Sequence, residues 1–203
     1  TAMIVIYLGL AVALHLVLTA LFLVFPSMLQ EQFGLASSSH WWFYLSVMVT
    51  SFFAMVPFII IGEKKRRMKP VLCGAIASLT LATAGFTGVS SSLVAAWAVL
   101  FFFFMAFNLL EASLPSLISK EAPAASKGTA MGVYSTSQFM GAFLGGAFGG
   151  YLLEVAGLQG VTSVVKQTEA IAAEALANVA RIKARQDSVV KQAASETEAA
   201  EME

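Results

Sequence analysis

The stretch FMAFNLLEASLPSLISKEAPAASKGTAMGVYSTSQFMGAFLGGAFGGYLLE, residues 104–154, decides the fold. It holds two apolar runs separated by a short polar loop, and the first run contains one carboxylate, Glu111. Pro115 stands four residues later and cannot donate the hydrogen bond that the carbonyl of Glu111 would otherwise accept. An ionisable side chain inside a membrane-length apolar run is costly and marks an ion or substrate path. Glu111 is therefore the first candidate functional residue.

Composition divides the chain into two parts. Of the 203 residues 58% are hydrophobic and 12% are charged, which is more apolar and less charged than an ordinary soluble domain. Half of the charged residues are confined to 162–203. We therefore predict an integral membrane part, residues 1–161, followed by a polar tail of unknown origin, rich in alanine and glutamate, at 162–203.

Several other function classes lack a pattern in this sequence. The basic residues are divided among short loops and the tail, without a stripe that would bind nucleic acid. Cys73 is the only cysteine, so no internal disulfide and no cysteine-based metal cage can form. His15 and His40 fall at different depths, and no HExxH, Walker or dinucleotide motif is present. We expect neither an enzyme nor a bound metal or cofactor.

The apolar part is long enough for five membrane spans. A span needs about 20 apolar residues, and runs such as Leu100 to Met105 lack the alternation of a membrane β-barrel strand. The sequence therefore predicts an all-α integral membrane fold. We expect the five transmembrane helices at residues 3–29, 41–62, 70–88, 93–119 and 129–153.

Lysine and arginine in short loops predict the orientation of the spans. Residues 30–40 and 88–92 contain neither type, and 120–127 contain Lys120 and Lys127. Residues 63–69 form a basic loop that contains Lys64, Lys65, Arg66, Arg67 and Lys69. Both basic loops are predicted to face the cytoplasm, where anionic lipid would attract the first. Five crossings would then leave Glu154 and the tail outside.

Four more polar residues are candidates for a proton or substrate pathway. Asn108 lies one helical turn before Glu111, whose ionised form is disfavoured in hydrocarbon. His15 is near the middle of the first span, where a histidine can carry a proton or hydrogen-bond a substrate. Tyr134 and Gln138 share a face of the fifth span and can line a cavity. The alternative for Glu111 and His15 is a structural hydrogen bond to a neighbouring helix.

The fifth span contains glycines four residues apart, Gly141, Gly145 and Gly149. Glycine at this spacing removes side chains from one stripe of a helix, so another helix can approach closely. We interpret the three as helix-packing residues. For the tail, a solvated or surface-lying helix is the first interpretation, and a coiled-coil partner helix is the second, because Thr168 and Gln186 interrupt its heptad seam.

The segment order and three motifs resemble the C-terminal half of a major facilitator superfamily transporter, in particular its YajR-type drug/proton antiporter-like group. The motifs are GEKKRRMKP (62–70), FNLLEASLPSLISKEAP (107–123) and KGTAMGVYSTSQFMGAFLGGAFGGYL (127–152). The resemblance covers 3–161 and implies that the five spans correspond to helices seven to eleven of twelve. We expect a truncated, frameshifted or fused sequence without the N-terminal transporter half and the twelfth helix.

The resemblance implies two bundles that rock around a midplane cavity. It indicates a multi-pass protein of the bacterial inner (plasma) membrane, part of a secondary transporter that exports a small molecule in exchange for protons. The alternative, from another class, is a membrane-anchored interaction or scaffold protein whose helical tail recruits a partner.

Overall fold

The computed structural model describes residues 2–65, 68–86 and 92–200, and helices joined by short turns make up these ranges. No strand occurs in them, so the predicted all-α fold is confirmed. The elements are, in order, α1 Ala2–Glu31, the 3₁₀ turn η1 Ser37–Ser39, α2 His40–Lys64, α3 Met68–Phe86, α4 Leu93–Glu121, the 3₁₀ turn η2 Ala124–Ser126 and α5 Lys127–Ala200.

The five predicted spans are present. Within the described ranges, five helical stretches are long and apolar enough to cross a membrane: Met3–Glu31, Ser37–Lys64, Met68–Phe86, Leu93–Glu121 and Ala124–Gly157. Each agrees with a predicted segment to within a few residues, because charged or turn-forming residues end the apolar runs. The hydroxyl of Ser92 caps α4 by accepting a hydrogen bond from the backbone N–H of Ala95 at 3.3 Å.

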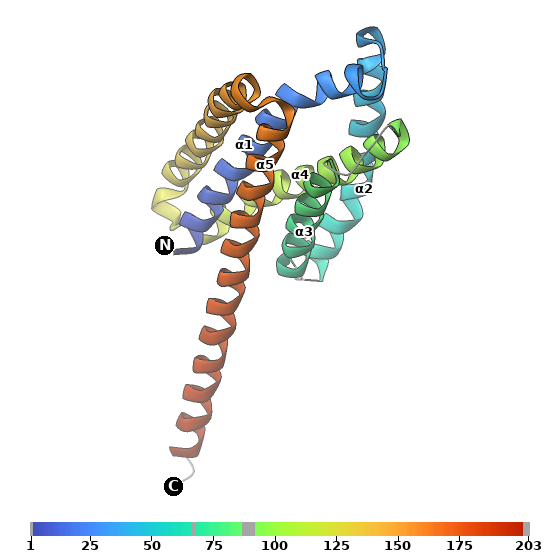
Figure 1. Ribbon diagram of the computed structural model, residues 1–203. Helices are drawn as coiled ribbons and strands as arrows, with labels where there is room; N and C mark the ends of the chain where they lie inside the picture. The colour runs from blue at the N-terminus through green and yellow to red at the C-terminus, as the bar shows by residue number, and fades with distance from the viewer. Residues whose placement is uncertain (1, 66–67, 87–91, 201–203) are drawn as a thin grey trace.

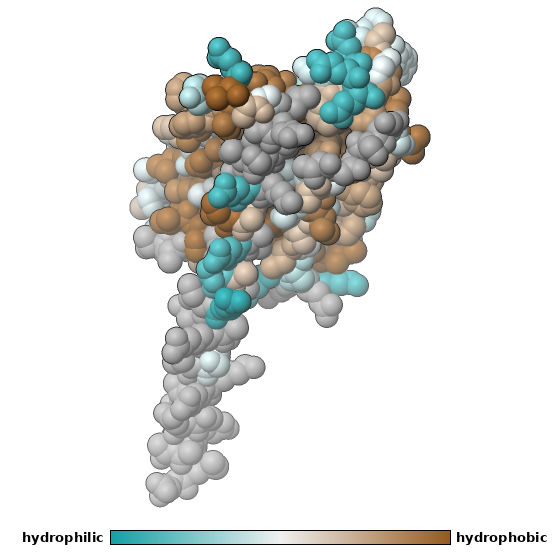
Figure 2. Space-filling model, in the orientation of Figure 1, coloured by the Kyte–Doolittle hydropathy of each residue, from teal (hydrophilic) through white to brown (hydrophobic). Residues whose placement is uncertain are grey.

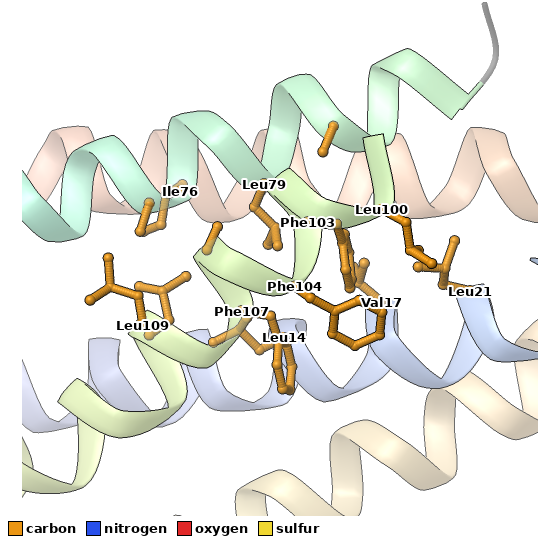
Figure 3. Packing of buried hydrophobic residues seen from close by; sticks show 14 of the residues in the cluster. Leu14, Val17, Leu21, Ile76, Leu79, Leu100, Phe103, Phe104, Phe107 and Leu109 are labelled. Carbon is orange, nitrogen blue, oxygen red and sulfur yellow. The ribbon is translucent and has the colours of Figure 1, made fainter. Parts of the chain in front are cut away.

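The core lies where α1, α3 and α4 meet. Figure 3 shows side chains of α1 pointing toward α4, and α4 in turn packing toward α3. Leu14 and Val17 on α1 and Phe103 and Leu110 on α4 are almost completely buried. Pro115 lies inside α4, and the helix nevertheless continues to Glu121. Helices α1 and α4 are therefore firmly held where they carry His15 and Glu111.

One ion pair joins the two basic loops. Lys120 Nζ at the end of α4 lies 3.1 Å from Glu63 Oε1 at the end of α2. The predicted cytoplasmic loops, 63–69 and 120–127, are therefore at the same end of the bundle. Lys64, Lys65 and Lys69 are exposed there. Arg66 and Arg67, which belong to the same predicted basic loop, lie outside the described residues.

Helix α5 bends sharply at Gly157, whose backbone has φ 63° and ψ −164°. A positive φ of this kind favours glycine. Figure 1 shows the chain folding back at the bend, after which a second helical arm runs past α1 and extends beyond the bundle. The arm corresponds to the predicted polar helix, and at residues 158–200 it is about 60 Å long.

The direction of this arm differs from the expectation that the chain after Glu154 stays outside. The turn at Gly157 sends the arm back toward the end of the bundle where the N-terminus lies (Figure 1). Figure 2 shows that hydrophobic side chains cover most of the described surface of the bundle in view, with hydrophilic groups gathered mainly near its ends and along the arm. This distribution fits the membrane assignment of the five spans.

Candidate functional site: a polar cluster between three helices

Four of the predicted polar residues come together within the apolar bundle. His15 comes from α1, Glu111 from α4, and Tyr134 and Gln138 from α5. Tyr134 and Gln138 are four residues apart and therefore share one face of their helix. We call His15, Glu111, Tyr134 and Gln138 the polar cluster. Its members lie on three different helices, so any relative movement of those helices changes its contacts.

The side-chain amide of Gln138 connects the cluster. Gln138 Nε2 donates a short hydrogen bond to Glu111 Oε1, lies 3.2 Å from the hydroxyl oxygen of Tyr134, and lies 3.4 Å from His15 Nε2. An amide NH₂ group has two hydrogens. Three possible acceptors therefore share two donors, and one contact always lacks a hydrogen from Gln138.

His15 has one nitrogen fixed by its own helix. His15 Nδ1 lies 3.0 Å from the carbonyl oxygen of Ala11, so Nδ1 carries a hydrogen and donates it. In the neutral imidazole Nε2 is then an acceptor, which suits its position opposite the amide of Gln138. The ring also contacts Phe107 edge-on, with centroids 5.9 Å apart. The hydrogen bond to Ala11 was not predicted from the sequence.

Glu111 has two oxygens in different environments. Oε1 accepts the hydrogen bond from Gln138, whereas Oε2 is buried without a hydrogen-bond partner among the described residues. Oε2 lies 3.9 Å from His15 Nε2, which makes a salt bridge when the imidazole is protonated. The side chain as a whole is 34% exposed. The Glu111 side chain is therefore partly exposed, while its buried Oε2 atom is left without a donor among the described residues.

One predicted residue, Asn108, and one nearby polar residue, Thr19, do not join the cluster. Asn108 is half-buried on α4, but within the described part of the chain it makes no hydrogen bond to the four residues. Thr19 follows His15 by one turn, and its hydroxyl donates to the carbonyl of His15 at 2.9 Å. Tyr134, in contrast, is 2% exposed. Residues one turn apart therefore both belong to the cluster on α5, where they are Tyr134 and Gln138. On α4 only Glu111 belongs to it, and Asn108 does not.

Beside the cluster, α5 packs directly on α1 through the glycine stripe. A Cβ atom added to Gly141 would lie 2.9 Å from the Cα of Val12, and one added to Gly145 would lie 2.9 Å from the Cα of Leu16. At Gly149 the nearest atom would be Leu23 Cδ1 at 3.1 Å. The numbering rises together on both helices, so they run parallel. The stripe sets the distance at which Gln138 meets His15.

The described residues contain no group of three or more His, Cys, Asp and Glu side chains that could hold a metal ion. The carboxyl, imidazole, phenol and amide groups of the cluster can form hydrogen bonds, and the carboxyl and imidazole groups can also exchange protons.

Comparison with known proteins gives a consistent result. The family model of the Major Facilitator Superfamily matches residues 2–161. The inner membrane transport protein YajR of Escherichia coli K12 is 43% identical over 148 residues, which are 73% of this chain and 32% of that protein. An uncharacterized transporter of Buchnera aphidicola subsp. Acyrthosiphon pisum is 33% identical over 132 residues, 65% of this chain and 34% of that protein. The chain spans about a third of the length of these relatives.

Proposed function

Because the chain belongs to the major facilitator superfamily, we propose that it forms helices seven to eleven of a secondary active transporter that exports a small amphipathic molecule in exchange for protons. An N-terminal half of the kind that the family's fold implies would supply the other wall of the cavity and the partner in alternating access. The observation that carries the proposal is the polar cluster, in which Glu111, His15 and Gln138 meet from three helices.

The exposed faces of two helices support a partner half. In α1 and in α4, 44% of the 18-residue apolar stretch is buried inside the bundle. The corresponding fraction is 22% in α2 and 17% in the first part of α5. Large side chains such as Phe53 on α2 and Phe143 on α5 are 67% and 68% exposed. Lipid and such an N-terminal half would cover these faces. We place the chain in the inner (plasma) membrane, because the E. coli relative is an inner membrane transport protein.

The placement of protons would decide which helices are bonded to one another. With a neutral imidazole and an ionised carboxylate, Gln138 on α5 donates to Glu111 on α4 and opposes His15 on α1. A proton on His15 Nε2 turns that atom into a donor, and Glu111 Oε2 at 3.9 Å is the nearest unpartnered acceptor. The link between α1 and α4 would then strengthen while Gln138 loses an acceptor.

Gln138 can also serve Glu111 after the carboxyl group itself takes up a proton. A half-turn of the amide replaces its NH₂ group by its carbonyl oxygen, which accepts the hydrogen of a neutral carboxylic acid. An apolar side chain at this position would satisfy neither state. The amide therefore lowers the cost of both protonation states, which an exchanging proton site in an apolar bundle requires.

Transport across a pH series tests the proposal. The whole transporter that includes this chain is assayed in everted membrane vesicles with a panel of small amphipathic compounds. Glu111→Gln imitates the protonated carboxyl group, so we expect transport to continue with a flattened pH profile. Glu63→Gln is the matched control, because Glu63 is an exposed carboxylate. We expect the control to keep the pH profile of the parent.

Two outcomes would contradict this assignment. An unchanged pH profile in Glu111→Gln together with a flattened one in His15→Asn would move the proton site to His15 and leave Glu111 as a structural residue. Transport by the parent that is independent of the proton gradient would remove proton coupling altogether.

A further inference from the structure

A groove of about 340 Å³ lies between α2, α3 and α4, away from the polar cluster. Its volume is within the range of roughly 300 to 1,000 Å³ that is usual for ligand sites. The walls are almost entirely apolar, with Phe58 and Ile61 from α2, Gly74 from α3 and Met105 from α4. The hydroxyl of Ser78 also lines it but donates to the carbonyl of Phe102 at 3.5 Å. The groove therefore suits a hydrocarbon chain.

The length of the groove and its opening at the surface fit one lipid acyl chain within a single leaflet. Along α3 it extends from Pro70 to Ser78, which corresponds to about 12 Å of helix. The hydrocarbon of one leaflet is about 15 Å thick. Gly74 is exposed, and a Cβ atom added there would meet nothing within 4 Å. The groove thus has free space beside Gly74 and runs along the bundle from its basic end.

Positive charge stands at one end of this groove. Pro70 directly follows Lys69, and the backbone N–H of Lys65 donates to the carbonyl of Ile61 at 3.1 Å. The nearby carboxylate of Glu63 is paired with Lys120 at 3.1 Å. Lys64, Lys65 and Lys69 are exposed and have no ion pair within the described part of the chain. Their charge is therefore available to an anionic group at the membrane surface.

We propose that this groove is a binding site for one anionic phospholipid. One acyl chain lies between α2, α3 and α4, and the phosphate group meets Lys64, Lys65 and Lys69. The basic loop is the one that the lysine and arginine count assigns to the cytoplasmic leaflet. The site uses neither the polar cluster nor any transport step, so it stands or falls independently of the proposed function.

Native mass spectrometry of the protein, purified at its full encoded length and stripped of lipid, tests the site. The probes are phosphatidylglycerol and phosphatidylethanolamine with identical acyl chains. We expect one tightly retained phosphatidylglycerol and a roughly tenfold preference for it, since each basic residue near the surface contributes to binding anionic lipid. Gly74→Leu fills the groove and should abolish retention of both lipids, whereas Gly74→Ala should keep it.

Matched variants separate the groove from the charge. Gly132→Leu is the matched control, because Gly132 is an exposed glycine of α5 where an added Cβ also meets nothing within 4 Å. This variant should bind lipid like the parent. Replacing Lys64, Lys65 and Lys69 together by Gln should remove the preference for phosphatidylglycerol while leaving one lipid bound. Thermal melts in lipid-free detergent verify that each variant is folded.

Three results would overturn the proposal. The first is undiminished retention of phosphatidylglycerol by folded Gly74→Leu. The second is equal retention of the two lipids by the parent, which would show that the lysines do not select the headgroup. The third is a dimer of the lipid-free parent that Gly74→Leu dissociates, which would make a second copy of the chain the occupant.

Discussion

The first part of α5 has two faces that differ in the size and the exposure of their residues. The inner face carries Gly141, Gly145 and Gly149 and packs on the backbone of α1. The outer face carries Phe139 and Phe143, which are 76% and 68% exposed. The smallest residues are therefore inside and some of the largest hydrophobic residues outside, the reverse of the arrangement in a soluble protein.

This contrast shows what holds a helix in a lipid environment. Lipid tails solvate phenylalanine as well as a protein core does, so hydrophobicity alone does not draw an aromatic face inward. Close contact between backbones, and hydrogen bonds between polar side chains, distinguish the inner face instead. Tyr134 and Gln138 continue the inner face from the glycines into the polar cluster.

The largest effect is expected for Gly145→Leu. A Cβ atom at Gly145 would already overlap the backbone of Leu16, and a backbone cannot move aside as a side chain can. We expect α5 to separate from α1, with a loss of about 3 kcal/mol or more in the free energy of unfolding. Thermal melts in detergent measure this loss. Phe143→Leu on the outer face is the control, and equal melting temperatures for the two variants would show that the glycine stripe is incidental.

Alanine substitutions along the stripe sharpen the comparison. Gly141→Ala places a methyl group against the backbone of Val12, so we expect a cost of about 1–3 kcal/mol. In Gly149→Ala the closest atom is Leu23 Cδ1 at 3.1 Å, a side-chain atom that can shift, and the cost should be below about 1 kcal/mol. Gly150→Ala, with nothing within 4 Å, is the neutral reference. Equal melting temperatures for the three alanine variants would contradict the expectation that the cost follows the closeness of the contact.

Gln138→Leu tests the polar section of the inner face. It removes the donor to Glu111 Oε1, so we expect a loss of about 1–3 kcal/mol when the carboxyl group is ionised. The loss should increase with pH, because an ionised carboxylate left without its donor costs more free energy than a neutral carboxylic acid left without its acceptor. Melts at several pH values, repeated in a Glu111→Gln background, measure the coupling. The same pH dependence in both backgrounds would exclude Glu111 as its source.

The smallest effect is expected for Lys120→Gln, which breaks the pair with Glu63 at the surface. Both side chains are about half exposed, at 57% and 48%, so water and salt screen the attraction. We expect a change below about 1 kcal/mol that disappears at high salt. A loss as large as that of Gln138→Leu would mean that the pair holds the ends of α2 and α4 together.

Much of the fold was predictable from sequence, because span length and charge are strong signals. The five apolar stretches end close to their predicted bounds, and the lysine loops lie at one end of the bundle. The arm after Gly157 agrees with the predicted polar helix, but its direction differs from the expectation that the tail stays outside. One glycine with a positive φ reverses the chain, and no periodicity in the sequence reports which way a helix leaves such a turn.

The candidate site was predictable in its members but not in its connections. His15, Glu111, Tyr134 and Gln138 were each identified as polar residues within apolar runs. Asn108 was added because it lies one turn from Glu111, yet it makes no bond to the cluster in the described part of the chain. That Gln138 is the residue linking the other three depends on the angle and distance at which α1, α4 and α5 cross, which sequence spacing on one helix does not contain.

The central claim is that Glu111 takes up and releases a proton, and infrared spectroscopy tests it without a known substrate. The carbonyl stretching band of a protonated carboxyl group is followed across a pH series in the whole transporter reconstituted in lipid, and in its Glu111→Gln variant. We predict that one component of this band disappears reversibly as the pH rises in the parent and that the same component is missing from the variant, whose other carboxyl groups still contribute. Identical pH-dependent spectra for the two proteins would contradict the claim.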